Sequence, residues 1–296
     1  MEEIELFKEA GSIARRVRAR AERLVVEGIK VIEICEELEE MIRAEGAEPA
    51  FPCNVGVNEV AAHYTAIPGD PSIIPPRSIV KVDIGVSLDG YIADTATTVV
   101  LNPELSPLAE AVRAALHQAI KAIRPGVKVS MIGAAVQKTL SSLGFKPIRN
   151  LTGHEIKRYN LHAGLTIPNV AVPSPGRIEE GHVYAIEPFA TTMRGAGEVV
   201  SLGAATIFRA DPRKLKVRGL KGEELELLKM LVERFDNLPY TPRWVQGFER
   251  LKELHERLVK LGRVHGYPVL VERRGAPVAQ FEHTVLVGER GCEIIT

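Results

Sequence analysis

Residues 79–100 read IVKVDIGVSLDGYIADTATTVV and form the most apolar hairpin-like stretch of the chain. β-Branched residues and period-2 alternation on both sides of a Leu-Asp-Gly turn predict two antiparallel strands. If the loop is residues 88–89, Asp83 lies directly opposite Asp94, and if it is residues 89–90, the two are diagonal neighbours. Both pairings place the two carboxylates on one face of the sheet, because the two registers differ by an even step.

Two carboxylates on one half-buried face repel each other. At a separation of about 5 Å they destabilise a sheet unless a positive charge lies between them. A metal ion is the simplest such charge. The alternatives are a carboxyl group that keeps its proton and shares it with its neighbour, or two aspartates at a solvent-exposed edge. The hairpin alone does not decide among these three interpretations.

The composition limits the class of protein. A chain of 296 residues suits one large domain, or one domain with an insertion, and can bury a sizeable core. The 38 basic and 38 acidic residues cancel, so no overall charge recruits nucleic acid or an anionic membrane. Three cysteines, an odd number, favour a reducing compartment over a disulfide framework. The sequence shows no signal-peptide pattern and no long apolar run, so we expect a cytoplasmic protein.

Apolar residues recur at three- and four-residue intervals in six segments, which predicts helices. These segments are residues 7–24, 31–41, 104–123, 129–143, 225–235 and 248–261. Runs typical of short strands lie both before and after the last two helices. A helical block of about 55 residues therefore interrupts β structure, and we interpret it as an insertion because neither flanking half closes a sheet alone.

Three further residues of the metal-ligand type stand in apolar surroundings. Glu187 lies on a predicted strand with the apolar residues 183–186, Glu282 lies between valine-rich flanks, and His154 follows a glycine at a predicted strand-to-loop junction. A buried carboxylate costs several kcal/mol unless it is paired or binds a cation. Each residue alone is more often an edge-strand or salt-bridged residue. Together with the two aspartates they indicate a metal centre.

The number and type of these residues indicate the chemistry. Four carboxylates and one imidazole exceed what one tetrahedral ion needs, and carboxylates can bridge two ions. An oxygen-rich set with a single imidazole suits Mn, Fe, Co or Zn. Two ions at such a site lower the pKa of a shared water and polarise a carbonyl group. The expected reaction is hydrolysis of an amide.

In order and in context, these residues resemble the five metal ligands of the methionine aminopeptidases. The matching features are the two hairpin aspartates, the Gly-His pair at 153–154, the Glu-Pro pair at 187–188 and the segment QFEHT at 280–284. The helical block and the segments GHEI at 153–156 and LHAG at 161–164 resemble the type 2 branch of the family. Type 1 enzymes lack the insertion.

The resemblance implies the pita-bread fold, an α/β (α+β) architecture of two pseudo-symmetric halves with curved antiparallel sheets and outer helices. It implies a catalytic domain of residues 1–208 and 266–296, and a winged-helix-like helical insertion subdomain at residues 209–265. The implied activity is removal of the N-terminal methionine from nascent proteins and peptides with a small second residue. The implied cofactors are two divalent metal ions per chain, which Co, Mn, Fe or Zn would satisfy.

The resemblance also implies a role for each ligand. By this matching Asp83 chelates one ion, Asp94 and Glu282 bridge both ions, and His154 and Glu187 hold the other. Glu187 also handles the proton of the attacking water. These assignments rest on the matching of positions and not on spacing or composition.

Two more histidines and four pocket positions follow from the same matching. His63 and His162 match the family histidines that flank the scissile bond and contact the substrate. An imidazole can donate a hydrogen bond to a developing oxyanion, although a lone loop histidine is more often structural. Four residues match the wall of the methionine pocket: Phe51, Leu161, Phe189 and Tyr267. The alternative for these four is ordinary packing in the core.

Two other functions stay open at this point. Proline-specific peptidases, the Xaa-Pro aminopeptidases and prolidases, have the same fold but carry a large additional N-terminal domain, whereas Asp83 comes early in this sequence. A non-catalytic homologue that binds RNA or protein is the second alternative. A basic cluster favours it, although a solvated surface explains such a cluster as well. The cluster comprises Arg209, Arg213, Lys214, Lys216, Arg218 and Lys221.

The expected partners follow from the implied activity. We expect a nascent polypeptide or peptide substrate, with transient contact to the ribosome as a further possibility. The neutral charge balance predicts no specific nucleic-acid partner and no membrane association. We expect a monomer.

Overall fold

The 79–100 segment forms the predicted hairpin in the computed structural model, which describes residues 2–211, 220 and 222–296. Its strands are β3 (Ile79–Leu88) and β4 (Tyr91–Val100). They lie within an eight-stranded sheet whose paired strands run in the order β1-β3-β4-β13-β8-β6-β7, with β14 pairing β13. All the pairings are antiparallel. The other strands of this sheet are β1 (Glu48–Val57), β6 (Thr152–Ile156), β7 (Thr166–Pro168), β8 (Val183–Ile186), β13 (Glu282–Val287) and β14 (Cys292–Ile294).

The hairpin adopts the second of the two registers considered above. Its turn is residues 89–90, and both turn residues have positive φ, 50° and 85°. This is the pattern of a type I′ turn, which Asp and Gly tolerate. Asp83 therefore pairs with Ala96 and Asp94 pairs with Gly85, so the two aspartates are diagonal neighbours on one face.

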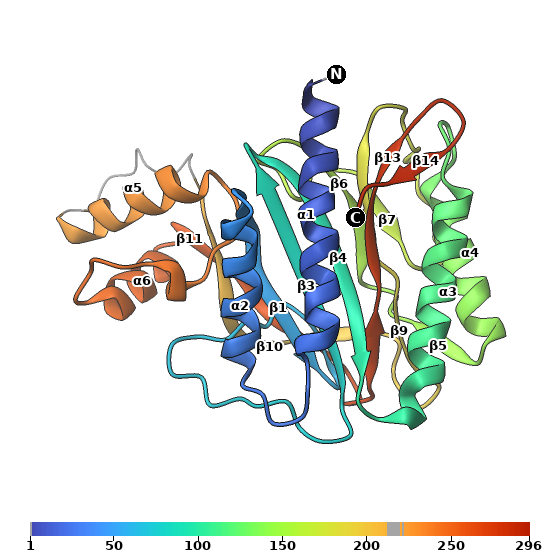
Figure 1. The fold of residues 1–296 in the computed structure, drawn as a ribbon, viewed down its shortest axis with the longest axis horizontal. Helices are drawn as coiled ribbons and strands as arrows, with labels where there is room; N and C mark the ends of the chain where they lie inside the picture. Colours follow the sequence, from blue (N-terminus) through green and yellow to red (C-terminus); the bar gives the residue numbers. More distant parts are fainter. Residues whose placement is uncertain (1, 212–219, 221) are drawn as a thin grey trace.

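Two helix pairs cover one face of the sheet (Figure 1). Helices α1 (Glu2–Leu24) and α2 (Val31–Ala44) share an apolar core with β1, β3 and β4. Helices α3 (Ser106–Ala122) and α4 (Val129–Ser142) share another with β8 and β13. A short 3₁₀ helix, η1 (Pro103–Leu105), precedes α3. The predicted helical periodicities thus correspond to the stripes that these helices bury.

Alternation along the strands decides which side chains face the helices. The even-numbered residues of β3 from Val80 to Val86, and Ala93 of β4, pack against α1 and α2. Because the side-chain period of a strand is two, Asp83 and Asp94 point to the opposite face. In the second half Val285 of β13 packs in the core of α3 and α4. The face of the sheet opposite the helices, called the far face below, therefore carries the two aspartates and is where we look for the predicted metal site.

Two three-stranded sheets border this far face. One has the order β10-β11-β2 and the other β12-β9-β5. Their strands are β2 (Val60–Ala62), β5 (Phe145–Pro147), β9 (Phe189–Thr192), β10 (Val199–Ala210), β11 (Val264–Glu272) and β12 (Val278–Gln280).

A helical segment projects from the end of the β10–β11 ladder, on the opposite side of the molecule from α3 and α4 (Figure 1). It contains α5 (Glu223–Phe235), the 3₁₀ helix η3 (Pro242–Trp244) and α6 (Leu251–Lys260). These elements bury a cluster of their own that includes Leu227 and Leu258. The segment occupies the range expected for the insertion. Its status as a subdomain separate from 1–208 and 266–296 stays a prediction.

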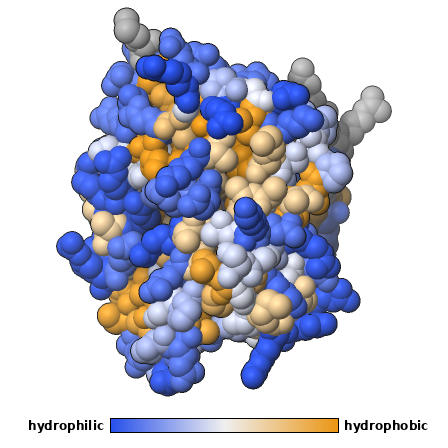
Figure 2. Space-filling model, turned by 90° about the vertical axis from the view of Figure 1, so that its right-hand side faces the viewer, coloured by the Kyte–Doolittle hydropathy of each residue, from blue (hydrophilic) through white to orange (hydrophobic). Residues whose placement is uncertain are grey.

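No helix in the described part of the chain has the length and apolar character that a bilayer crossing requires. Figure 2 shows the face beside α3 and α4, where hydrophilic residues predominate and apolar ones are interspersed. Single exposed apolar side chains such as Met131 are normal on a protein surface.

Candidate metal centre

The structure brings all five predicted metal ligands to the far face of the large sheet. They come from five strands or strand ends that follow one another in the sheet order β3-β4-β13-β8-β6. Sequence reasoning placed His154 at a strand-to-loop junction and Glu187 on a strand. Instead, His154 lies in the middle of β6, and Glu187 follows the last residue of β8 and precedes β9. The five residues are Asp83, Asp94, Glu282, Glu187 and His154.

Three of the donor atoms lie close enough together to hold a metal ion. One ligand atom each from Asp94, His154 and Glu282 lie within 4.8 Å of one another. Nε2 of His154 is 3.6 Å from Oδ2 of Asp94 and 3.5 Å from Oε1 of Glu187. Asp83 is the diagonal neighbour of Asp94 across the hairpin. The geometry brings four carboxylates and one imidazole to one place.

Buried, unpaired oxygen atoms show that this donor set fits a cation. Among the residues that the structure describes, Oδ1 of Asp83, Oδ1 of Asp94 and Oε1 of Glu282 are buried without a hydrogen-bond partner. Glu282 receives one bond at its other oxygen, from Nε2 of Gln280 at 3.3 Å. Leaving such an atom unsatisfied is costly. Carboxylate oxygens with a single imidazole are a set that Mn, Fe, Co or Zn accept.

The shifted pKa values of the five residues also indicate that the site needs a cation to keep its carboxylates ionised. Burial raises the pKa of Asp83 to about 7. Burial, followed by the charge of neighbouring carboxylates, raises the pKa values of Asp94, Glu187 and Glu282 well above their usual range. Burial also lowers the pKa of His154 well below its usual value, so the imidazole is neutral. A nearby divalent cation reverses these carboxylate shifts, because it stabilises their ionised forms.

Threonine hydroxyl groups hold the two central strands of the site together. Strands β4 and β13 pair at only two positions. Oγ1 of Thr284 accepts a bond from the backbone N–H of Asp94 at 2.8 Å and donates to its carbonyl at 2.7 Å. Thr95 donates to the carbonyl of Glu282 at 2.8 Å. These side chains fix two of the ligands relative to each other, and sequence reasoning missed them because they look like ordinary strand formers.

A cavity of about 220 Å³ opens beside the five ligands. All the residues that the sequence suggested as ligands, catalytic groups or pocket walls line it. Sequence reasoning missed several others, because they come from distant segments and carry no local signal of a site. These are Asn54, Ala62, Asn150, Leu151, Thr152, Ile207 and Pro239.

His63 has a backbone conformation that a non-glycine residue seldom adopts, with φ of 64°. Its backbone N–H donates to Oδ1 of Asn54 at 2.8 Å, and its Nδ1 lies 3.2 Å from the carbonyl oxygen of Pro268. The ring of Tyr267 meets the imidazole edge-on, at 5.6 Å between centroids. Burial lowers the pKa of His63, so the ring is neutral near pH 7.

His162 lies beside the proposed ligand His154 and lines the same cavity as His63. Its ring centroid is 4.3 Å from that of His154. Burial, with smaller contributions from His63 and Arg209, lowers the pKa of His162 to about 4. A neutral imidazole carries one N–H, which can donate a hydrogen bond to an oxygen atom in the cavity.

The apolar wall rests on a close contact between Phe51 and Gly85. A Cβ atom at position 85 would lie 2.3 Å from the ring of Phe51. Only glycine at position 85 allows this aromatic ring to approach β3 so closely, beside the diagonal pair of aspartates. Leu161 packs in the same apolar cluster as Phe51, whereas Phe189 belongs to another. The two clusters border the cavity.

Comparisons with known proteins identify the family. The sequence model described as metallopeptidase family M24 matches residues 5–289. A methionine aminopeptidase of Thermococcus onnurineus is 44% identical over 301 residues, which cover 100% of both chains. One from Methanothermobacter thermautotrophicus is 42% identical over 99% of this chain and 98% of its own.

Solved structures with less than 25% identity show the same fold. A thermophilic Arx1 superposes with a TM-score of 0.85 at 19% identity, covering 100% of this chain and 90% of its own. The methionine aminopeptidase of Thermotoga maritima gives 0.71 at 24%, covering 100% and 96%. The prolidase of Pyrococcus furiosus gives 0.65 at 18%, covering 100% of this chain and 64% of its own. The pita-bread fold is thus confirmed, and the chain belongs to metallopeptidase family M24, within which it groups with the archaeal, type 2 methionine aminopeptidases.

Proposed function

We propose that this aminopeptidase removes the N-terminal methionine from nascent proteins and peptides whose second residue is small, and that it uses two divalent metal ions. The observation that carries the proposal is the convergence of two buried carboxylates, two partly buried carboxylates and one buried imidazole beside a cavity. Whole-length similarity to proteins named methionine aminopeptidases supports the substrate class. Two ions account for five donors better than one tetrahedral ion does.

The proposed arrangement of ligands follows the order of the strands. In this proposal Asp83 would hold one ion, His154 and Glu187 would hold the other, and Asp94 and Glu282 would contribute to both. The central positions of β4 and β13, joined by threonine hydroxyl groups, support the bridging roles. Two bound divalent ions supply a nucleophilic water at neutral pH and polarise the scissile carbonyl. Co, Mn, Fe and Zn all suit these donors.

The chain's own groups position the substrate and move its protons. We propose that His63 and His162 both contact the substrate beside the scissile bond, and that His162 donates a hydrogen bond to the substrate carbonyl and to the oxyanion that develops from it. The lowered pKa of His162 supports this donor role, because its neutral imidazole has one N–H to donate. In neutral His63 the single N–H is on Nδ1, which faces the carbonyl oxygen of Pro268, so its Nε2 accepts a hydrogen bond from a substrate N–H. Glu187 is proposed to accept the proton of the attacking water.

The methionine side chain is proposed to lie against the apolar part of the cavity. An unbranched thioether suits an aromatic and aliphatic slot, since sulfur makes favourable contacts with aromatic rings. We propose that the same cavity, of about 220 Å³, limits the size of the second residue. The proposed walls are Phe51, Leu161, Phe189 and Tyr267.

Peptide products test this specificity. The metal-loaded enzyme should release only the first residue of Met-Gly-Met, as measured by mass spectrometry. Peptides that begin with Met-Trp are the matched control and should be cleaved poorly, because a large second residue does not fit. Efficient cleavage of Xaa-Pro peptides that lack methionine would favour a proline-specific peptidase instead.

The remaining partner assignments stay predictions. These are a monomeric state, transient contact with the ribosome, a cytoplasmic location and the absence of a specific nucleic-acid partner. The basic cluster concerns the ribosome and nucleic-acid predictions. Its members Arg213, Lys214, Lys216, Arg218 and Lys221 lie outside the described residues.

A further inference from the structure

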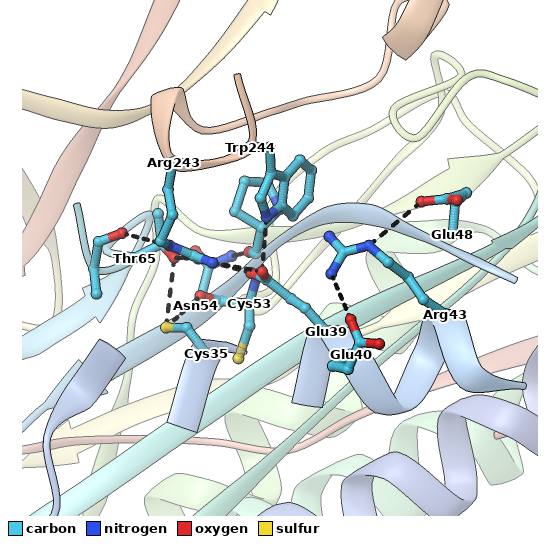
Figure 3. A network of polar contacts seen from close by, with 12 residues as sticks. Cys35, Glu39, Glu40, Arg43, Glu48, Cys53, Asn54, Thr65, Arg243 and Trp244 are labelled. Carbon is cyan, nitrogen blue, oxygen red and sulfur yellow. Dashed lines mark hydrogen bonds and ion pairs between the residues drawn. The ribbon is translucent and has the colours of Figure 1, made fainter. Parts of the chain in front are cut away.

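A buried ion pair joins helix α2 to the helical segment between β10 and β11 (Figure 3). Glu39 of α2 is 1% exposed. Its two carboxylate oxygens accept bonds from Nη1 and Nη2 of Arg243 at 2.7 and 2.9 Å, and one of them accepts a bond from Nε1 of Trp244 at 2.7 Å. Both donors belong to η3. A buried Arg–Glu pair does not by itself show a gain in stability, because removing two charges from water is costly. The other contacts of Arg243 and Glu39 therefore indicate what the pair does.

The guanidinium group of Arg243 also holds the segment that follows His63. Its Nε donates to the carbonyl oxygen of Ala66 at 3.1 Å, and Nη2 lies 3.4 Å from Oγ1 of Thr65. Thr65 is fully buried. Arg243 thus restrains the backbone three residues after His63.

The carboxylate of Glu39 holds the segment on the other side of His63. It accepts a bond from the backbone N–H of Cys53 at 3.1 Å. The next residue, Asn54, accepts the backbone N–H of His63, and the N–H of Val55 donates to the carbonyl of Tyr64 at 2.8 Å. The segments on both sides of His63 therefore contact the same Glu39–Arg243 ion pair, residues 53–55 through Glu39 and residues 65–66 through Arg243.

We propose that Glu39 and Arg243 are positioning residues for His63. A backbone with φ of 64° at a non-glycine residue persists when its surroundings restrain it, and the ion pair restrains both neighbouring segments. Neither residue lines the cavity, so each acts through His63. The inference rests on the proposed function, since it gives His63 a role at the substrate.

Arg243→Lys is the first test. Lysine keeps the positive charge but lacks the planar fork, so it cannot bond both oxygens of Glu39 and the carbonyl of Ala66 at once. We expect kcat for a Met-Gly peptide to fall about tenfold, because small misplacement of a positioned group is costly, while KM changes little. The matched control is Tyr240→Phe, which removes a buried bond of 2.9 Å to His255 within the same helical segment. It should leave kcat unchanged.

A double-mutant cycle separates positioning from stability. If Arg243 acts through His63, Arg243→Lys should lower kcat no further in a protein that already carries His63→Ala. A tenfold fall in both backgrounds would overturn the inference. Equal kcat losses in Arg243→Lys and Tyr240→Phe would also overturn it, because they would indicate general loosening of the helical segment.

The NMR spectrum of the His63 imidazole supplies a readout that does not depend on activity. The resonance, assigned by its disappearance in His63→Ala, should shift in Arg243→Lys and stay in place in Tyr240→Phe. If Arg243→Lys does not fold, Glu39→Gln combined with Arg243→Met removes the ion pair without leaving a buried charge and should produce the same shift. An unmoved resonance would overturn the inference. An inactive wild type with the expected shift would refute the proposed function alone.

Discussion

Asp94 occupies the centre of the proposed metal site, between Asp83 across the hairpin and Glu282 on the neighbouring strand. Its Oδ1 is buried and unpaired within the described residues. A ligand shared by two ions contributes to the affinity for both. We therefore predict that Asp94→Asn abolishes peptidase activity and reduces metal content, measured by inductively coupled plasma mass spectrometry.

The matched control for this prediction lies on the same hairpin. Asp89→Asn makes the same chemical change at the turn, where Asn tolerates the positive φ of 50°. It should leave metal content and activity unchanged. Full activity of Asp94→Asn at saturating metal would refute the bridging role.

His162 provides the second test at this scale, because it lines the cavity and is not one of the five proposed ligands. If it bonds the substrate carbonyl or the oxyanion, His162→Ala should lower kcat by about 10²–10³ and leave metal content intact. His63→Ala should behave similarly. Loss of metal in His162→Ala would show that His162 is a ligand, and a wild-type kcat would show that its role is structural.

The two histidines should act on one intermediate. In that case the double variant loses less than the product of the two single losses. Independent, multiplicative losses in steady-state kcat would mean that the two imidazoles contact different parts of the substrate.

The ligand-type residues can be predicted from sequence, because a charged residue in an apolar strand is an anomaly that local pattern reveals. The residues that support them cannot. Thr95 and Thr284 fit a strand equally well whether or not their hydroxyl groups bond a neighbour. Pro239 and Ile207 reach the cavity from the helical segment and from β10, and no local pattern marks them.

Among the secondary-structure elements, the helices and the β3–β4 hairpin follow from periodicity and turn chemistry. The register of the hairpin could not be predicted from sequence, because a loop at residues 88–89 and a loop at residues 89–90 both fit the pattern. The structure decides between them, since residues 89 and 90 have the positive φ of a two-residue turn. The order of the strands does not follow from local pattern. β4 pairs with β13, almost 190 residues away in the chain, and such a pairing depends on the packing of the whole sheet.

Helix α6 carries a pH-dependent contribution to stability at His255, which is 5% exposed. Burial lowers the pKa of His255 from 6.5 to about 4. Above pH 6.5 the imidazole is neutral in both the folded and the unfolded chain. Between pH 6.5 and pH 4 the unfolded chain binds a proton that the folded chain does not, so the free energy of unfolding falls as the pH falls.

We predict that His255→Gln weakens this pH dependence by at most about 3 kcal/mol between pH 6.5 and pH 4. Glutamine does not titrate and can still accept the bond from Tyr240. Denaturant unfolding of both proteins at the two pH values measures the difference. The exposed His117, changed to Gln, is the control and should leave the pH dependence as it is. Identical pH dependence in wild type and His255→Gln would contradict the prediction.

At the scale of the whole molecule, the site exists because one sheet receives ligands from both halves of the chain. The first half supplies Asp83 and Asp94, and the second supplies His154, Glu187 and Glu282. Helices α1 to α4 lie on the opposite face of this sheet, so Asp94 and Glu282 are buried, and Asp83 and Glu187 partly buried, away from these helices. Assembly of this kind requires a compensating positive charge, which is the physical reason for expecting metal ions here.

The most direct measurement is metal-dependent release of methionine. The protein is stripped with a chelator, reloaded separately with Co, Mn, Fe and Zn, and assayed on a Met-Ala peptide while its bound metal is counted. We predict no release from the stripped protein, restored release with at least one metal, and binding of two ions per chain. Release that persists after stripping, or no release with any of the four metals, would contradict the proposed function.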